Sequence, residues 1–419
     1  EDSFVLNTSN KNALQQFLAY LSRSWKGPIH LNIGLNEPLY GLAAFKQFSF
    51  EPQTNKVEPT ILPDFSVLSG KKIMVLVGQM EPNHPFERLL SEFASWSNVV
   101  VLVENTSNLQ NELFNHCIDR SLNSIDPNDS AFQPEVLLSF GGAIVSKRIK
   151  AYLRQISLYI HWRIGFDFPE MNTFGTLSAQ LSQDPVIFMR ALLQTSLNLQ
   201  TTNFKGKWKA IDYKAKDRLT QFTSSAQHLH DFDVFQALQA TLEGPLNLHL
   251  ANSSVVRYAQ LFDPIPSVTY FSNRGTSGID GSVSTAVGAA LASPSEQHLL
   301  ICGDTSFIYD SNALWTSPFP KNLKIMIIQN HGGGIFQIIP GPAQSPLREQ
   351  YFEATHPHHP GKIAEGFGFE VHYLSEKSKL ENTLAAFLAD NNGPQILEIS
   401  TEQSLNAQVL KDFFNFVKN

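Results

Sequence analysis

Short apolar runs alternate with helical patterns along two long stretches of the chain. In the first stretch, apolar runs of the kind that is buried on both faces of a sheet lie at 71–77, 99–105, 135–140 and 157–162. Helical periodicity follows at 85–96, 144–155 and 184–198. In the second stretch the alternation predicts strands near 245–250, 267–271, 297–302, 323–329, 369–373 and 395–400, with helices at 231–243, 253–261, 280–292 and 308–316. Strands that alternate with helices predict an α/β protein with two doubly wound parallel sheets.

The segments around these stretches predict the domain boundaries. Residues 10–22 have helical periodicity and residues 29–33 alternate like a strand, but one helix and one strand cannot form a core. Because the chain also begins at Glu1 and not at Met, we expect a remnant of a third domain, most of which is missing. The predicted parts are a domain remnant at 1–41, a linker at 42–66, a central domain at 67–198, a polar linker running into a helix at 199–230, and a second α/β domain at 231–419.

Charge and composition argue against several classes of function. A formal net charge of -7 gives no reason to expect a nucleic-acid partner, which requires clustered basic residues. No apolar run approaches the roughly 18–20 residues that span a bilayer, and the N-terminal residues lack the layout of a signal peptide. Cys117 and Cys302 lie in apolar contexts and are expected to be buried free thiols. Together these features predict a cytoplasmic protein without integral membrane association.

Two strands of the second stretch are followed by polar residues that predict a metal site. One apolar run ends at Gly303 and places Asp304 where doubly wound sheets bind ligands. The next run ends at Asn330, 26 positions later (330 − 304 = 26), and His331 and three glycines follow. A carboxylate, an amide oxygen and the Gly332 carbonyl suit magnesium or calcium that also holds a diphosphate. Singly, Asp304 and Asn330 are more simply a helix cap and a turn residue, but together with the strands they favour the metal site.

A glycine-rich loop precedes this pair. The string SNRGTSGIDG (272–281) runs into a helix, and the backbone amides of such a loop can cradle a diphosphate. For the loop alone, a tight turn into a closely packed helix is an equally good interpretation. Farther along, prolines separate His356, His358 and His359, which indicates an extended loop and not a metal site.

Three strings together point to one family. SNRG-x-SGIDG-x-VSTA, GD-x-SF-x-x-D-x-N-x-L and N-x-GGGIF resemble those of the thiamine-diphosphate-dependent 2-succinyl-5-enolpyruvyl-6-hydroxy-3-cyclohexene-1-carboxylate synthase family of menaquinone biosynthesis. The resemblance runs from about residue 28 to the C-terminus and is densest in 251–340. Two positions depart from the usual cofactor motif, which has a glycine in place of Thr305 and an asparagine in place of Gln329.

The resemblance implies roles for individual residues. Thiamine diphosphate would be bound by Ser277, Gly278, Ile279, Gly303, Asp304, Thr305 and Ser306, and Mg²⁺ (or Mn²⁺) by Asp304, Asn330 and Gly332. Ile279 would be the apolar wedge behind the rings of the cofactor. The substrate-binding residues would be Ser253, Arg257, Arg274, Lys147, Arg148, Ile335, Phe336 and Ile339. Ser253 and Arg257, at i and i+4, would present a hydroxyl and a guanidinium to a carboxylate from one helix face.

The implied reaction is decarboxylation of 2-oxoglutarate and 1,4-addition of the resulting succinyl unit to isochorismate. The family places its activating glutamate in the first domain and builds its active site between subunits, so a homodimer or homotetramer is expected. We expect the chain alone to be inactive, because nothing in residues 1–27 replaces that glutamate. Two alternatives stay open: another thiamine-diphosphate enzyme, of acetolactate synthase-like or 2-oxoacid decarboxylase-like type, and a non-catalytic module.

Overall fold

The computed structural model describes residues 3–6, 15–18, 30–33, 62–166, 171–197, 202–339, 341–390 and 393–418. Near the N-terminus, β1 (Ser3–Leu6) and β2 (His30–Ile33) form a parallel pair, and residues 15–18 are helical. The strand predicted at 29–33 is therefore present, whereas β1 was not predicted. The rest of the helix predicted at 10–22, and the predicted linker up to residue 61, lie outside the described residues.

The central domain is built on a five-stranded parallel sheet with the order β4-β3-β5-β6-β7. Its strands are β3 (Ile73–Val77), β4 (Val99–Val103), β5 (Val136–Phe140), β6 (Ile160–Ile164) and β7 (Ala179–Leu181). Its helices are α2 (His84–Ala94), α3 (Ile118–Leu122), α4 (Lys147–Gln155), α5 (Pro185–Gln194) and α6 (Phe204–Gln221), with 3-10 turns η1 (Phe65–Leu68) and η2 (Asn105–Ser107). The predicted strands and long helices are present, and the short elements β7 and α3 were missed.

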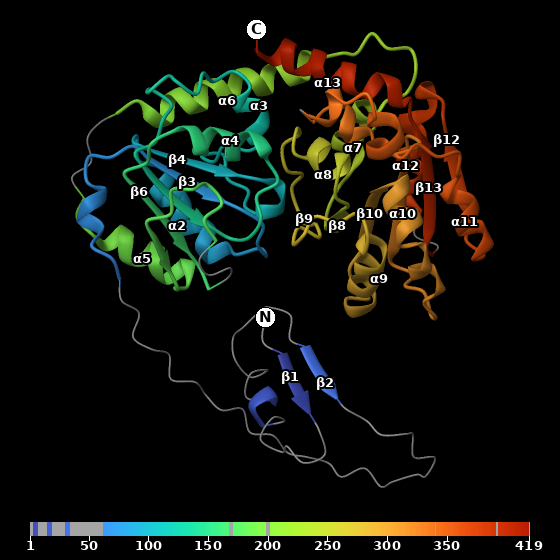
Figure 1. Ribbon diagram of the computed structural model, residues 1–419, viewed down its shortest axis with the longest axis horizontal. Helices are drawn as coiled ribbons and strands as arrows, with labels where there is room; N and C mark the ends of the chain where they lie inside the picture. Colours follow the sequence, from blue (N-terminus) through green and yellow to red (C-terminus); the bar gives the residue numbers. More distant parts are fainter. Residues whose placement is uncertain are drawn as a thin grey trace.

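Side chains of the central strands alternate between two cores, as the period of a strand requires. Val75 and Val77 pack with Phe86 of α2 and Phe188 of α5 on one face of the sheet. Met74 and Leu76, on the same strand, pack on the other face in a core that contains Leu153 of α4 and Trp208 of α6. Helices therefore cover both faces, which confirms the doubly wound fold (Figure 1). Phe65 belongs to the first core, two residues before the predicted domain start at 67.

The C-terminal domain has a six-stranded parallel sheet with the order β12-β13-β11-β10-β8-β9. Its strands are β8 (Leu246–Leu250), β9 (Val268–Phe271), β10 (His298–Gly303), β11 (Leu323–Gln329), β12 (Val371–Leu374) and β13 (Gln395–Ser400). Its α-helices are α7 (Asp231–Thr241), α8 (Ser254–Ala259), α9 (Ser282–Ala292), α10 (Asp304–Tyr309), α11 (Pro360–Gly366), α12 (Leu380–Ala389) and α13 (Gln403–Lys418). Its shorter turns are η3 (Ser311–Trp315), η4 (Gly334–Gln337), η5 (Pro342–Gln344), η6 (Arg348–Glu353) and η7 (Lys377–Lys379). Both faces again carry a core, so this domain is doubly wound too.

Each sheet has a point where the chain reverses its direction of strand addition. In the central sheet, β4 is added on one side of β3 and β5 on the other; in the C-terminal sheet, β9 and β10 are added on opposite sides of β8. Loops that leave such a pair of neighbouring strands diverge, and a crevice opens between them at the carboxyl ends. The fold therefore provides two crevices, one at β3/β5 and one at β8/β10.

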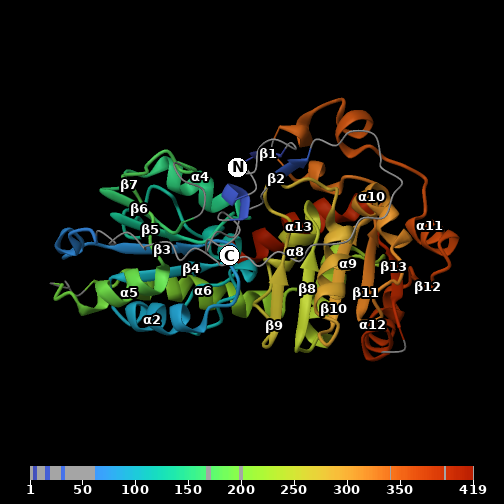
Figure 2. The same cartoon turned by 90° about the horizontal axis from the view of Figure 1, so that it is seen from below.

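The helix α6 joins the two domains. Its N-terminal residues Phe204 and Trp208 lie in a core of the central domain, while Ala215 and Leu219 lie in the main core of the C-terminal domain. In Figures 1 and 2 the two α/β bodies lie side by side, with α6 and α13 on the same side of the molecule. The predicted linker at 199–230 thus contains a helix that packs on both domains.

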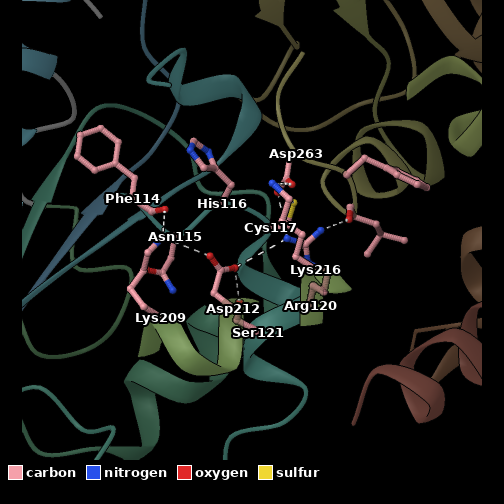
Figure 3. Close-up of polar contacts among 12 residues, drawn as sticks. Phe114, Asn115, His116, Cys117, Arg120, Ser121, Lys209, Asp212, Lys216 and Asp263 are labelled. Atoms are coloured by element: carbon pink, nitrogen blue, oxygen red, sulfur yellow. Dashed lines mark hydrogen bonds and ion pairs between the residues drawn. The ribbon is translucent and has the colours of Figure 1, made fainter. Parts of the chain in front are cut away.

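A buried charge cluster also crosses the domain junction (Figure 3). The side chain of Arg120 on α3 is fully buried; it donates to Asp263 Oδ1 (3.0 Å) and to the Leu261 carbonyl (3.3 Å) of the C-terminal domain. Lys216 of α6 contacts the same carboxylate at 2.8 Å. Burial raises the pKa of Asp263, but Arg120 and Lys216 outweigh this effect and bring it down to about 2. The junction therefore contains a charged, geometrically fixed contact.

Candidate cofactor and substrate site

Asp304 is the centre of the crevice at β8/β10. Strand β10 ends at Gly303, and the carboxylate of Asp304, the first residue of α10, is almost fully buried. Its Oδ2 accepts hydrogen bonds from the backbone amides of Asn330 (3.2 Å) and Gly332 (3.1 Å), which follow β11. The structure thus brings the three predicted metal-ligand residues together at the ends of the neighbouring strands β10 and β11.

Asn330 is held by a residue that the sequence analysis missed. Its side-chain amide donates to Asp231 Oδ2 at 3.2 Å, so its side-chain oxygen remains an acceptor. Asp231, the first residue of α7, also accepts from the hydroxyl of Thr401 at 2.6 Å. Burial raises the pKa of Asp231 to about 6, against the effect of these hydrogen bonds. No pattern signals this contact, because Asp231 lies 99 positions before Asn330.

Gly332 has a conformation that requires glycine. Its φ is +142°, and a Cβ atom would lie 2.6 Å from the carbonyl oxygen of Glu353. The next amide, of Gly333, donates to that same carbonyl at 2.7 Å. The turn after Asn330 therefore packs directly on the end of η6, which fixes the Gly332 peptide beside Asp304.

The residues around Asp304 fit a hard divalent cation by the chemistry of their donors. Burial raises the pKa of the Asp304 carboxylate, and a cation beside it would favour its charged form. His356 lies 3.7 Å from Asp304 Oδ2, and its ring nitrogens have no hydrogen-bond partner within the described residues. The part of the chain that the structure describes has no cluster of three or more His, Cys, Asp or Glu side chains suited to a metal. The predicted set is of another kind, with one carboxylate, one amide oxygen and one peptide carbonyl.

Asn252 holds the glycine-rich loop (272–281) at this crevice through hydrogen bonds. The side-chain amide of Asn252 donates to the carbonyls of Asn273 and Gly278, both at 2.6 Å, and its oxygen accepts from Arg274 at 2.5 Å. The hydroxyl of Ser306 on α10 donates to the carbonyl of Ile279. Asn252 lies within the ANSSVVR string, where sequence analysis selected only Ser253 and Arg257.

This anchoring leaves the loop amides available for a ligand. Among the described residues, no protein acceptor receives the amides of Ser277, Gly278 or Ile279. Asp310 accepts from the amide (2.7 Å) and hydroxyl (3.0 Å) of Ser284, and so fixes the first turn of α9. Free amides beside a helix N-terminus are what a diphosphate group requires, so the loop fits the predicted cofactor.

A cavity of about 550 Å³, here called the interdomain cavity, lies between the two domains. The central domain contributes Asp119, Lys147, Arg148 and Ala151. The C-terminal domain contributes Ser254, Arg257, Tyr258, Leu261, Ile335, Ile338, Ile339, Leu410 and Phe414. Five of the predicted substrate residues, Lys147, Arg148, Arg257, Ile335 and Ile339, therefore line one cavity.

The cationic wall of the interdomain cavity begins at α4. Ser146 caps this helix, and the buried carboxylate of Glu104 accepts the amides of Val145 and Ser146, both at 2.7 Å. The guanidinium of Arg148 donates to Asn123 and lies 4.1 Å from the Phe414 ring centroid across the cavity. Lys147 and Arg148 are exposed at the start of α4, and both line the interdomain cavity.

The opposite wall carries Arg257. This side chain is half-buried, and its Nε has no hydrogen-bond partner within the described residues. Burial lowers its pKa, while Asp119 and Glu104 raise it. A half-buried cation with an unpaired donor is suited to binding a carboxylate.

Three predicted substrate residues lie elsewhere. Ser253 has a φ of +79° and precedes α8, so it is not on the helix face that the i, i+4 spacing assumed, and Ser254 lines the cavity instead. Phe336 packs on Phe352, with ring centroids 5.7 Å apart. Arg274 lines a different cavity, at the end of the central sheet.

Comparison with known proteins identifies the family. Residues 253–399 match the family model described as thiamine pyrophosphate enzyme, C-terminal TPP binding domain. A 2-succinyl-5-enolpyruvyl-6-hydroxy-3-cyclohexene-1-carboxylate synthase of Flavobacterium johnsoniae is 38% identical over 93% of this chain and 71% of its own length. The chain belongs to this synthase family. Synthases of the same name from Christiangramia forsetii and Flavobacterium psychrophilum are 35% and 36% identical, over 94% and 98% of this chain and 70% and 75% of their own lengths.

Thr305 and Gln329, the two residues that depart from the family's cofactor motif, both form hydrogen bonds to nearby residues. The hydroxyl of Thr305 donates to Asp304 Oδ1 at 3.0 Å, beside the Thr305 amide, which donates to the same oxygen. The buried side chain of Gln329 donates to the carbonyl of His358 at 2.6 Å and so holds the THPHHP segment against β11. Residues 354–359 have no regular structure, which confirms the predicted loop.

Two further expectations concern the chain as a whole. Cys117 and Cys302 are buried free thiols, as predicted. Within the described ranges, no helix has the length and apolar character needed to cross a membrane.

Proposed function

We propose that this member of the synthase family decarboxylates 2-oxoglutarate and adds the succinyl unit to isochorismate, as a step of menaquinone biosynthesis. The observation that carries this proposal is the interdomain cavity, where Arg257 of one domain faces Lys147 and Arg148 of the other. Both substrates are carboxylic acids. Three cations outnumber the one carboxylate, Asp119, around this cavity, so its charge suits a reaction that joins two acids.

The cofactor site would lie at the β8/β10 crevice. Asp304, Asn330 and the Gly332 carbonyl would hold Mg²⁺ (or Mn²⁺), and the amides of the glycine-rich loop, with Gly303, Thr305 and Ser306, would hold the diphosphate of thiamine diphosphate. When bound, the cofactor supplies a nucleophilic carbon for the decarboxylation of a 2-oxo acid. Ile279, whose carbonyl Ser306 fixes, would support the rings from behind.

The substrate acids would be divided between the two walls of the interdomain cavity. Arg257 would hold the distal carboxylate of 2-oxoglutarate, with Ser253, directly before α8, assisting it. Arg274, in the loop that follows β9, would hold an acidic group of the donor from the neighbouring cavity. Lys147 and Arg148 would hold carboxylates of isochorismate. Ile335 and Ile339 line the cavity between these cations and would exclude water from the reacting carbons, with Phe336 supporting them from η4.

The glutamate that activates the cofactor would come from outside the described residues. Among the side chains described as lining the interdomain cavity, none is a glutamate. We propose that the glutamate belongs to another domain of a homodimer or homotetramer, so that the 419-residue chain does not turn over by itself.

A complementation assay would test the proposed reaction. The chain is incubated with thiamine diphosphate, Mg²⁺, isochorismate and either 2-oxoglutarate or pyruvate, alone and together with the part of the Flavobacterium johnsoniae synthase that precedes the matched region. We expect product only from 2-oxoglutarate and only in the complemented sample. Equal use of pyruvate would contradict the substrate assignment in favour of an acetolactate synthase-like enzyme, whereas turnover by the chain alone would contradict only the glutamate proposal. Absence of cofactor binding in both samples would favour a non-catalytic module.

A further inference from the structure

His356 has a buried imidazole ring without a hydrogen-bond partner. Its side chain is 12% exposed, and neither of its two buried ring nitrogens is hydrogen-bonded to any of the described residues. Buried polar atoms of folded proteins are nearly always hydrogen-bonded, so an exception calls for a specific cause, such as a role in binding. A neutral imidazole carries one N–H donor and one acceptor, and a charged imidazole carries two donors. In either form, at least one buried N–H of His356 requires an acceptor.

The loop that carries His356 is fixed to the turn that follows β11. The amide of His356 donates to the carbonyl of His331 at 3.2 Å. Two residues farther along, the carbonyl of His358 accepts from the side chain of Gln329 at 2.6 Å. The ring of His358 stacks on that of His356, with centroids 5.5 Å apart and planes at 20°. The loop backbone and this stacking therefore set the position of the His356 ring and leave its nitrogens for another contact.

The ring lies beside the carboxylate of Asp304 but forms no hydrogen bond with it. The distance from His356 Nε2 to Asp304 Oδ2 is 3.7 Å, which exceeds a hydrogen bond. That oxygen accepts the amides of Asn330 and Gly332. The other oxygen, Oδ1, accepts the amide and the hydroxyl of Thr305. The carboxylate thus has its own donors, and the ring lies at the edge of the proposed cation site.

The proposed cofactor offers two partners at this place, the divalent cation and the diphosphate. Mg²⁺ and Mn²⁺ prefer oxygen ligands, whereas imidazole suits softer metals such as zinc and copper. The diphosphate carries several anionic oxygens, and each can accept an N–H donor. We propose that His356 binds the cofactor directly, by donating a ring N–H to a diphosphate oxygen beside the cation at Asp304. This inference rests on the proposed cofactor site and adds to it a side chain from the loop at 354–359.

One departure from the family's cofactor motif gains a role in this arrangement. Gln329 stands where the motif has an asparagine, and its side chain reaches the carbonyl of His358. Asparagine is one methylene shorter and, from the same backbone, ends short of that carbonyl. Gln329 is therefore a positioning residue, because it holds the loop in the place where His356 meets the diphosphate.

Calorimetric titration of the 419-residue chain with thiamine diphosphate in excess Mg²⁺ tests the inference. His356→Leu removes the donor and should weaken the affinity about 10-fold or more, whereas His356→Gln keeps an N–H donor and should recover part of this loss. His358→Leu is the matched control, because it removes an exposed ring from the same loop, and should stay within about 2-fold of the wild type. Gln329→Asn restores the family's usual residue, yet should weaken binding about 3-fold or more, with no further effect in the His356→Leu chain.

Thermal unfolding without the cofactor separates binding from a structural role. The ring forms no hydrogen bond to the described residues, so His356→Leu should unfold at the wild-type temperature or above it. Addition of thiamine diphosphate and Mg²⁺ should then raise the unfolding temperature less in this variant than in the wild type. A variant that unfolds at a lower temperature without the cofactor would make the ring a structural element and overturn the inference.

Mn²⁺ in place of Mg²⁺ distinguishes the diphosphate from the cation as the partner of the ring. Pulsed electron paramagnetic resonance detects nitrogen nuclei that are bound directly to Mn²⁺, and we expect the same spectrum from wild type and His356→Leu. A nitrogen coupling that the variant loses would make His356 a metal ligand and overturn the proposal. Equal affinities of wild type and His356→Leu would overturn it too, while leaving the proposed cofactor site intact. Failure of the wild type to bind thiamine diphosphate would contradict that site, and the inference with it.

Discussion

Asp304 and Asp231 lie at the carboxyl ends of the C-terminal sheet, whereas Lys150 and Arg163 line the corresponding crevice of the central sheet. Both crevices arise in the same way, from the point where a parallel sheet reverses its strand order. One collects buried carboxylates and free loop amides, and the other collects buried cations. The backbone fold therefore places a crevice in each domain, and the side chains at the strand ends give the two crevices opposite charge.

The largest effect is expected from Arg120→Met, because Arg120 joins the two domains through Asp263 and the Leu261 carbonyl. Removal of the fully buried guanidinium leaves Asp263, whose side chain is 24% exposed, without its main partner, so we expect the free energy of unfolding to fall by about 3 kcal/mol. Denaturant unfolding measures this change. Lys216→Met, at an exposed cation on the same carboxylate, is the control and should cost about 1 kcal/mol or less. Similar losses in the two variants would show that the buried pair does not hold the junction.

Glu104→Gln removes a buried carboxylate of the central domain, which accepts the backbone amides of Val145 and Ser146 at the start of α4. Burial raises the pKa of Glu104 from 4.5 to about 7, so between these pH values the folded state binds more protons than the unfolded state. The wild type should therefore lose stability relative to the variant as the pH rises from about 4.5 to about 7, by on the order of 3 kcal/mol. Unfolding curves at a series of pH values give this difference. A difference that is independent of pH would mean that Glu104 is already charged at the lower value.

Gly332→Ala would perturb the acidic crevice alone. The positive φ and the contact with the Glu353 carbonyl both oppose a Cβ atom, so we expect a loss of about 2–3 kcal/mol in unfolding free energy. Gly288→Ala is the matched control, because a Cβ atom on this helical glycine would meet no heavy atom within 4 Å beyond its own helix, and should gain up to about 1 kcal/mol. Thermal unfolding of both variants measures these changes in unfolding free energy. An equal change in the two variants would contradict the role given to the Gly332 turn.

The sequence predicts those features of the fold and the site that depend on residues close together in the chain, and misses those that depend on residues far apart. The buried strands were predicted because each is a local apolar run, such as 323–329, and the metal ligands because Asp304 and Asn330 each follow such a run. Asp231, Asn252 and Glu104 were missed, because each acts through hydrogen bonds to residues that no local pattern connects with it. Ser253 was placed on a helix face by its spacing, but the helix begins one residue later. The separation of Arg274 from Arg257 into two cavities follows from domain packing, which periodicity does not encode.

The crevice at β8/β10 is proposed to hold thiamine diphosphate through a divalent cation. Calorimetric titration with thiamine diphosphate, with and without Mg²⁺, tests it most directly on wild type, Asp304→Asn and Thr305→Gly. We expect Mg²⁺-dependent binding that Asp304→Asn weakens about 100-fold or more and that Thr305→Gly, which restores the usual glycine, leaves intact. Binding that is independent of Mg²⁺, or equal in wild type and Asp304→Asn, would contradict the proposed role of Asp304 as a metal ligand.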